Sequence, residues 1–436
     1  MIKKIQQDFS YYSHEFKDNY RKGVHRLRTI LASRAQAQAF VSNAGGTAVV
    51  LGYEPDAPDK NAQELYALLA ASPYIDDAVQ TFLGSIYETG AENQNAMYSD
   101  SARCLEILHD PVMARAAGAG AVSAGKWIAT LAGQSCNLYR DMNAVAASDI
   151  AMTAVAASET AMAAVVSNAT ALNAVVTSQA AMNAVAASET AMAAIAASQT
   201  AMTAVAASQT AMAAVAASQT AMAAVIGNSA ALNAVVSSQT AMTAVAASQT
   251  AMTAVAASQT ARAAIEKSQV AKDAIAASDM ATAKYAVGAA GLKPADYANM
   301  AAVAASQTAM AAVINSEAAR TALVSSSVAR KALKASSLAV EMSLVSSDGQ
   351  YWNSIGTKTM RGLILYTKAG NTDNAFTITK VDSTTLASNN NARNAATSGS
   401  TGYKDWLEAF PNSSWVLSSI TFYAYYRTTK IKYIPC

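Results

Sequence analysis

The sequence is poor in charge, in aromatic residues and in histidine. Charged residues make up 14% of the 436 positions and aromatic residues 7%, whereas an ordinary soluble domain carries about 25% charge. Lys and Arg (31) nearly balance Asp and Glu (29), which excludes a strongly basic nucleic-acid-binding protein. The hydrophobic content of 52% argues against intrinsic disorder. Three histidines and three cysteines leave little material for a metal centre or disulfides, so we expect no cofactor and no metal.

Long apolar runs and a secretory leader are also missing. The chain starts Met-Ile-Lys-Lys-Ile-Gln-Gln-Asp, which is positively charged but has no apolar run behind it. Apolar runs in the middle are about seven residues long, and a membrane-spanning helix needs about 20. We therefore expect a soluble chain, made in the cytoplasm without a signal peptide and without membrane insertion.

A ten-residue repeat fills the middle of the chain. One copy reads Ala151-Met-Thr-Ala-Val-Ala-Ala-Ser-Glu-Thr160, and the register holds without insertion from Met142 to Lys272. The repeat is interrupted at about 279–299 and resumes at Met300. Position one is Ala, position five is Val or Ile, and position eight is Ser or Asn. Position two is usually Met or Leu but also accepts Arg262, which predicts that it lies beside the core and not deep within it.

The repeat favours helix over strand, because alanine is a good helix former and a poor strand former. Positions one, four, five and eight fall within about 120° on a helix, which makes one narrow stripe. The alternative is a β-solenoid, in which Arg262 and Lys272 would be buried charges. Two helical arrangements stay open. Long helices could wind into a bundle, or Ser or Asn at position eight could cap a new helix in every copy and give a solenoid of short helices.

The flanks differ from the repeat, so the sequence predicts a mainly α protein in three parts. Residues 1–140 form a helical N-terminal region with a basic run at 21–28, which we interpret as a solvated helix face. Residues 141–347 form the Ala-rich shaft. Residues 348–436 form a small β-rich tip, with strands predicted at 362–368, 375–381 and 415–426.

No catalytic motif stands out, and the chain is predicted not to be an enzyme. The glycine-rich run 117–125 lacks the lysine and the preceding strand of a phosphate loop, so we interpret it as a close-packing helix segment. Cys104 and Cys136 are interpreted as buried thiols. Asp405 and Glu408, three apart near Trp406, could be a glycosidase-like carboxylate pair, but two acids in a loop are usually solvated surface.

Aromatic residues in the tip are the candidate recognition residues. Tyr351, Trp352, Tyr403 and Trp406 flank turn-rich loops, where aromatic faces could stack on sugar rings or belong to the core. Trp415 and Phe422 are assigned to the core. The four loop aromatics are our candidate receptor-binding residues.

In the residues that make the rod, the chain resembles a tail fibre or whisker-like virion fibre of tailed bacteriophages. The resemblance rests on decads such as residues 204–212 (Ala-Val-Ala-Ala-Ser-Gln-Thr-Ala-Met) and on the head, rod and tip layout. It implies a virion protein whose N-terminal region binds other tail or baseplate proteins, whose shaft forms a homotrimer, and whose tip recognises a glycan or protein on the host surface. Fibre shafts of that kind use heptads or β-structure, and the ten-residue period departs from both.

Three other functions are kept open. The chain could be a structural connector whose tip binds another virion protein, a fibre whose tip depolymerises glycans through Asp405 or Glu408, or a bacterial surface adhesin. An adhesin needs an export signal. In the fibre hypothesis, several tips on one particle would gain avidity without strong single contacts.

Overall fold

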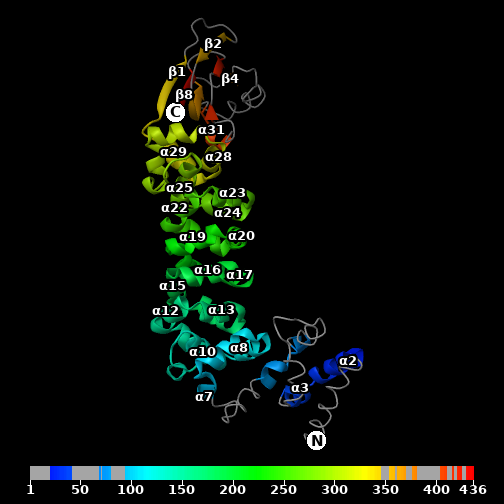
Figure 1. The fold of residues 1–436 in the computed structure, drawn as a ribbon. Helices are drawn as coiled ribbons and strands as arrows, with labels where there is room; N and C mark the ends of the chain where they lie inside the picture. The colour runs from blue at the N-terminus through cyan, green and yellow to red at the C-terminus, as the bar shows by residue number, and fades with distance from the viewer. Residues whose placement is uncertain are drawn as a thin grey trace. The chain divides into compact units, whose positions relative to one another are not determined.

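The structure is a computed structural model that describes residues 20–41, 68–69, 71–79, 94–344, 353–358, 361–369, 376–380, 403–409, 415–416, 420–424 and 429–436. The described chain is mainly helical, with antiparallel strands only towards its C-terminus, which confirms the predicted fold class (Figure 1). It separates into two compact units, Met1–Val215 and Ala216–Cys436. Each is described by itself, and the division into residues 1–140, 141–347 and 348–436 stays a prediction.

In the first unit, the N-terminal helices are short and precede the repeat. Exposed His25 and Arg28 lie on the first of them, in agreement with a solvated basic face. The helices are α2 (Tyr20–Leu31), α3 (Arg34–Val41), α7 (Gln94–Tyr98), α8 (Ser101–His109), α9 (Pro111–Ala119) and α10 (Ala121–Leu131), followed by the 3-10 helix η1 (Cys136–Leu138).

Each copy of the repeat forms one short helix, and almost all of these helices have nine residues. They are α11 (Met142–Ala146), α12 (Asp149–Ala157), α13 (Glu159–Ser167), α14 (Ala169–Thr177), α15 (Gln179–Ala187), α16 (Glu189–Ala197), α17 (Gln199–Ala207) and α18 (Gln209–Ala217).

The residue at position eight separates consecutive helices. Ser158 has extended backbone dihedrals (φ −101°, ψ 118°) and is both the C-cap of α12 and the N-cap of α13. Its backbone N–H donates to the carbonyl of Val155 at 3.1 Å, and its hydroxyl accepts from the N–H of Ala161 at 3.2 Å. Asn168 caps α14 in the same way. The predicted N-cap is therefore confirmed, and it ends one helix as it starts the next.

Consecutive helices turn sharply and stack on the helix three places later. The bend is 99° between α12 and α13 and 100° between α15 and α16. Helix α12 contacts α15, and α13 contacts α16, so about three helices complete one turn (Figure 1). This is a solenoid of short helices within one chain, which excludes both the wound bundle of long helices and the β-solenoid.

Within the described residues, no single helix is long and apolar enough to cross a membrane. Four pairs of consecutive helices, each bent by 99–107° at the break, would suffice only by combined length and composition.

The methionine position lies in the core, which corrects the prediction that it flanks the core. Ala151, Met152, Val155 and Ala156 are each at most 1% exposed. The buried positions are thus one, two, five and six, because each helix packs on the interior and also on the turn before and after it. The predicted stripe of positions one, four, five and eight assumed that each helix packs on one neighbouring surface only, and so it left out position two.

Serine hydroxyls join neighbouring turns. Ser178 Oγ donates to the carbonyl of Ala146 at 2.6 Å, and Ser208 Oγ donates to that of Val176 at 2.6 Å, each across 32 residues. The acceptor at position six is a carbonyl at the helix C-terminus that has no partner in its own helix. The hydroxyl therefore caps its own helix and also gives a hydrogen-bond partner to a carbonyl at the end of the helix stacked against it.

The second unit continues the same pattern. Its helices are α19 (Gln219–Gly227), α20 (Ser229–Ser237), α21 (Gln239–Ala247), α22 (Gln249–Ala257), α23 (Gln259–Lys267), α24 (Gln269–Ala276), α25 (Asp279–Ala289), η2 (Pro294–Asp296), α26 (Met300–Ala304), α27 (Gln307–Val313), α28 (Glu317–Ser325) and α29 (Ser327–Lys334). Helices α19, α22, α25 and α28 contact in succession and form one column (Figure 1). The Ser-to-carbonyl bond across 32 residues recurs from Ser268 to Val236 at 2.5 Å.

The interruption at 279–299 repeats a local structure of the first unit. Helices α10 and α25 both have 11 residues, and each is followed by a 3-10 helix of three residues. Lys126 is buried and donates to the carbonyls of Cys136 (3.3 Å) and Tyr139 (3.0 Å). Lys284 is fully buried and donates to the carbonyl of Pro294 at 3.0 Å. Burial lowers the pKa of Lys284.

Two further features match between these segments. Gly133 and Gly291 both have positive φ, 73° and 81°, which side chains rarely adopt. In both segments, the carbonyl of the last helical residue accepts a hydrogen bond from a serine hydroxyl 27 residues later. Ser158 donates to Leu131 at the end of α10, and Ser316 donates to Ala289 at the end of α25. The segment at 279–299 is therefore a second copy of the element that precedes the repeat.

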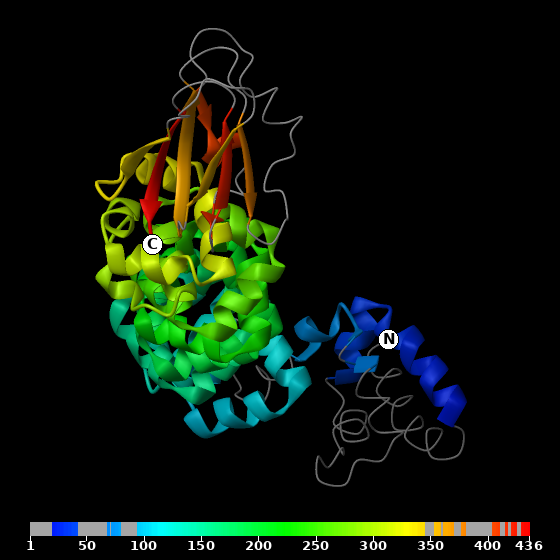
Figure 2. The same cartoon turned by 90° about the horizontal axis from the view of Figure 1, so that it is seen from above.

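The tip consists of two antiparallel sheets in the second unit. One has the order β1-β8-β3-β5 with β6 also on β3, and the other has the order β2-β7-β4. Strands β3 and β8 lie side by side (Figure 2). The strands are β1 (Val340–Leu344), β2 (Asn353–Lys358), β3 (Gly362–Ala369), β4 (Phe376–Lys380), β5 (Tyr403–Asp405), β6 (Trp415–Val416), β7 (Ile420–Ala424) and β8 (Thr429–Pro435), with the short helix α31 (Trp406–Ala409). Strands lie at the three predicted places, but the run at 415–426 holds two strands, β6 and β7, in different sheets. Strands β1, β2, β5 and β8 were not predicted.

Candidate functional site

The β tip and the last helices of the second unit share one hydrophobic core. Leu323 and Leu333 on the helices, and Leu363, Leu407 and Ile434 in the tip, are all unexposed members of the same cluster. Buried apolar area stabilises their association by about 25 cal/mol per Å². The tip is therefore held against the end of the helical stack, and not tethered by a linker.

Polar contacts reinforce this junction. Lys334, near the end of α29, forms ion pairs with Asp405 and with Glu408 Oε1, the latter at 2.7 Å. Gln307 Nε2 donates to the carbonyl of Pro435 at 3.0 Å, and Arg361 Nη2 donates to Asn315. The tip is thus attached to α27, α29 and Asn315 through Arg361, Asp405, Glu408 and Pro435.

The two carboxylates of the predicted pair have structural partners. Asp405 Oδ1 accepts from the backbone N–H of Leu407 (3.1 Å) and of Glu408 (3.3 Å), so it caps helix α31. The hydrogen bond and the charge of Lys334 hold the pKa of Glu408 below its usual range. Burial lowers the pKa of Lys334, but its bonds to Asp405 and Glu408 outweigh that effect and raise it. Glu408 is therefore held in its charged form, whereas the general acid of a glycosidase must be protonated.

The four candidate receptor-binding residues have different places. Tyr351 and Trp352 lie outside the described residues. Tyr403 pairs with Lys368 at the start of β5. Trp406 is 1% exposed and belongs to the interior, so it does not present a face on which a sugar could stack, and that part of the prediction is wrong. Trp415 is 5% exposed, which confirms its assignment to the core; the side chain of Phe422 lies outside the described residues.

The cysteine and glycine interpretations are confirmed. Cys104 and Cys136 are buried free thiols, and burial raises the pKa of Cys104 to about 12. A Cβ on Gly125 would lie 2.4 Å from the backbone of Asp141, so this glycine allows close helix packing. Among the residues that the structure describes, no group of three or more His, Cys, Asp or Glu could hold a metal ion.

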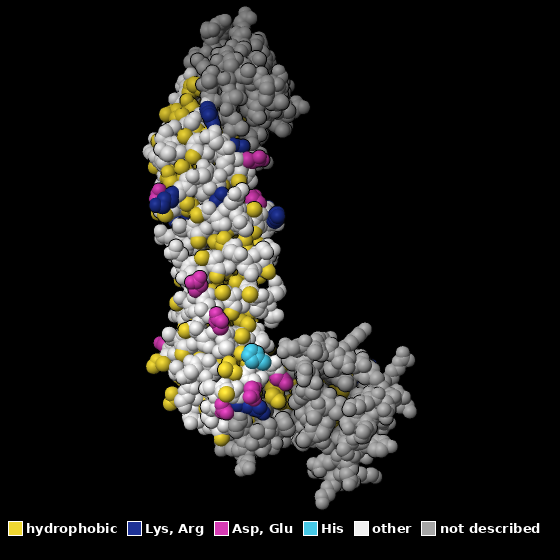
Figure 3. All heavy atoms as spheres, viewed as in Figure 1, with side chains coloured by type: hydrophobic (Ala, Val, Ile, Leu, Met, Phe, Trp, Pro, Cys, Tyr) yellow, Lys and Arg dark blue, Asp and Glu magenta, His cyan; other side chains and the backbone are white. Residues whose placement is uncertain are grey.

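Charge in the second unit is concentrated in the last turns of the helical repeat, from Arg262 onward. No charged residue occurs between Glu189 and Arg262, and the face in view in Figure 3 carries few charged side chains along the regular repeat. Arg262, Arg320 and Arg330 all stand at position two. Each donates to a position-six carbonyl six residues earlier, at 2.5, 2.5 and 2.6 Å.

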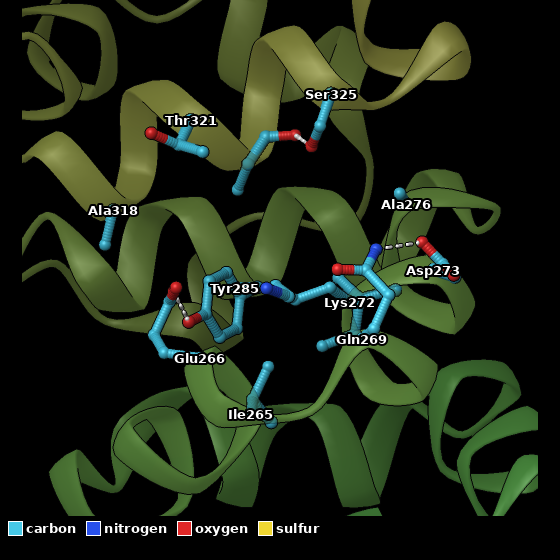
Figure 4. Close-up of a pocket in the computed structure, with 12 residues that line it drawn as sticks. Ile265, Glu266, Gln269, Lys272, Asp273, Ala276, Tyr285, Ala318, Thr321 and Ser325 are labelled. Carbon is cyan, nitrogen blue, oxygen red and sulfur yellow. Dashed lines mark hydrogen bonds between the residues drawn. The ribbon is translucent and has the colours of Figure 1, made fainter.

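A cavity lies between helices of the second unit and is lined in part by charged residues. Helices α23, α24, α25 and α28 enclose about 270 Å³, lined by Glu266, Lys272, Asp273, Tyr285 and apolar neighbours (Figure 4). Tyr285 is 3% exposed and donates its hydroxyl to Glu266. Burial first, and this hydrogen bond second, raise the pKa of Tyr285. The signal in the sequence was the run of departures from the repeat at 262–273.

The comparisons with known proteins give no family. No protein-family model matches the chain, and a comparison with curated proteins finds no match.

Proposed function

We propose that this chain is a structural fibre protein of a tailed-bacteriophage virion. Its N-terminal region attaches to other tail or baseplate proteins, and its C-terminal tip contacts a glycan or protein on the host surface. The observation that carries the proposal is the junction in the second unit, where the tip shares a core with the last helices. A fibre that transmits force to a receptor-binding tip needs such a junction.

The helical repeat supports a mechanical role. Each turn is joined to the next by serine hydroxyls, and its surface offers few charges for unrelated partners. Repeat stability is then approximately a sum of nearest-neighbour terms, so the shaft lengthens by adding copies. A spacer of adjustable length is what presentation of a tip requires.

The homotrimer remains part of the proposal in a changed form. Each helical stack covers its own apolar side chains, with Met152 and Val155 unexposed in a single chain. Burial of the repeat therefore does not require three chains wound together. We propose that self-association involves surfaces outside the buried positions of the repeat, and sedimentation velocity on the full chain tests it by distinguishing monomer from trimer.

The decisive experiment combines localisation with competition. Antibodies against residues 403–436 should label fibres on virions of the phage that carries the gene, and the purified full chain should lower adsorption of that phage to its host. A structural connector would label virions without affecting adsorption. Absence of label on intact virions would refute the fibre proposal.

A further inference from the structure

Helices α7–α14, which we call the first module, and helices α22–α29, the second module, repeat one arrangement at an offset of 158 residues. Asp110 caps α9, and Ser268, 158 residues later, caps α24. Helix α10 contacts α7, α9 and α13, as α25 contacts α22, α24 and α28. The buried lysines of the two modules, Lys126 and Lys284, stand at the same offset. Equivalent positions of the modules can therefore be compared residue by residue.

In the first module, helix α9 holds a segment of the N-terminal region. Arg115 Nε donates to Asp76 Oδ1 at 2.8 Å, and Arg115 Nη2 donates to the carbonyl of Ser72 at 2.7 Å. Residues 75–79 are helical, and Ile75 is fully buried. One arginine thus anchors the start of a short helix to α9.

The equivalent position of the second module has the opposite charge. The residue 158 positions after Arg115 is Asp273 on α24. Arg115 is half-buried, whereas Asp273 is exposed. In the part of the chain that the structure describes, Asp273 forms no ion pair, and its Oδ1 accepts from Gln269 Nε2 on its own helix at 2.7 Å. The position that anchors a segment in the first module is therefore open in the second.

The charge at position 273 does not belong to the repeat. Position three of the repeat is Thr, Ala or Asn in every copy from Thr153 to Ala263, so the stacking of the helices does not require a carboxylate there. In the first module, the charged residue at the equivalent position holds another segment of chain. A charged residue at the same place in the second module indicates the same use, with the sign reversed.

A pocket of about 270 Å³ lies beside Asp273. Its lining includes Ile265, Ile275 and Tyr285, and Figure 4 shows Asp273 towards one end of the pocket and Tyr285 towards the other. The equivalent of Tyr285 in the first module is Trp127, which is fully buried. The second module thus offers an apolar hollow next to an exposed carboxylate.

We propose that this pocket is the docking site for a helical segment of a protein partner, bound to α24 as residues 72–79 are bound to α9. A basic side chain of that segment pairs with Asp273, and an apolar side chain fills the hollow between Ile275 and Tyr285. Hydrogen bonds between a guanidinium group and a carboxylate are about twice as strong as neutral ones. Buried apolar area adds about 25 cal/mol per Å².

The charge at the site excludes the equivalent segment of another molecule of this chain. That segment carries Asp76 and Asp77, which would face the carboxylate of Asp273, and like charges repel. The partner is therefore a different protein, whose docking segment is basic where residues 72–79 are acidic.

Fluorescence anisotropy on the full chain tests the proposal with two labelled peptides of residues 68–79. The peptide with Asp76→Arg carries the complementary charge and should bind. The unchanged peptide should bind at least about tenfold more weakly. No binding of the Asp76→Arg peptide, or equal affinity for both peptides, would overturn the proposal.

A charge reversal in the chain gives the matched test. Asp273→Arg recreates the charge of the first module, so this variant should bind the unchanged peptide at least about tenfold more tightly than the Asp76→Arg peptide. Asp273→Thr, which restores the residue found at Thr243, should lose the preference. Glu189→Gln removes an exposed acid elsewhere on the stack and should keep the wild-type preference. The circular dichroism spectrum should be unchanged in all three variants, because both positions are exposed. An unreversed preference in Asp273→Arg refutes the docking site, and antibody labelling of virions decides the fibre proposal independently.

Discussion

Arg262 Nη1 donates to the carbonyl of Ala256 at 2.5 Å, and this bond replaces one that a serine makes elsewhere in the solenoid. In regular turns the position-six carbonyl accepts from a serine 32 residues later. The residue 32 positions after Ala256 is Gly288, and a Cβ there would lie 2.2 Å from the Ala256 oxygen. Arginine at position two therefore appears where the stacked serine is missing.

The same logic explains Arg320 and Arg330. They cap the carbonyls of Ile314 and Val324, and the positions 32 residues further on lie beyond the last helix, which ends at Lys334. Solenoids require distinct terminal repeats, because an end has no next turn. These arginines supply the missing donor from within the last turns.

Substituting Arg262 with methionine should therefore destabilise the second unit, although methionine is the usual residue at that position. The variant leaves the Ala256 carbonyl without its charged donor, at a cost of about 1.5–3 kcal/mol. Urea unfolding of the full chain, followed by circular dichroism, measures the difference. Lys267→Ala is the control, and equal midpoints for wild type and Arg262→Met would contradict the capping role.

Serine at position eight should contribute twice to stability. In Ser188→Ala, the N–H of Ala191 loses its cap and the carbonyl of Ala156 loses its hydroxyl donor. We expect a loss of about 1–2 kcal/mol. Ser188→Asn, the residue found at the equivalent Asn168, keeps the cap and should lose less. Hydrogen exchange at Ala191 measures the local effect, and identical protection in Ala and Asn variants would disprove the N-cap contribution.

The local parts of the fold could be predicted from the sequence. Ser158 followed by Glu159 is a local helix-start pattern, with an N-cap residue and an acid in the first turn. The run 362–368 is rich in residues that favour strands, and it forms β3. The burial of Met152 could not be predicted from one stripe, because it depends on contact with helices three copies away. Likewise, Lys334 and Glu408 are 74 residues apart, and nothing local to either residue indicates their pairing. Long-range contacts of this kind determine which residues meet in the candidate sites, whereas local capping determines where the helices begin and end.

Acid should loosen the tip through Glu408. Its pKa is lowered in the folded chain, so its contribution is present above the unfolded pKa and is lost as the pH falls through the folded value. The pKa of Lys334 is raised, so its contribution is present at neutral pH and is lost only as the pH rises through the alkaline range. Between about pH 7 and about pH 3, the urea midpoint should fall further for wild type than for Glu408→Gln. An identical fall in both proteins would show that the ion pair does not couple stability to pH.

The length of the shaft should be adjustable in whole repeats. Removing residues 179–208 deletes three copies, which is about one turn, and joins Ser178 to Gln209, the pair of residues that begins a normal helix. Because each turn depends on its neighbours and not on its distance from the ends, the shortened chain should keep the same helicity per residue and a cooperative transition. Removing residues 179–183 instead places Ser178 before Ala184 and takes away half a helix, so Ser188 shifts out of register with Ala156. Circular dichroism should then show lost helicity and a lower melting temperature. If the half-copy deletion were as stable as the three-copy deletion, the serine ladder would not set the register of the solenoid.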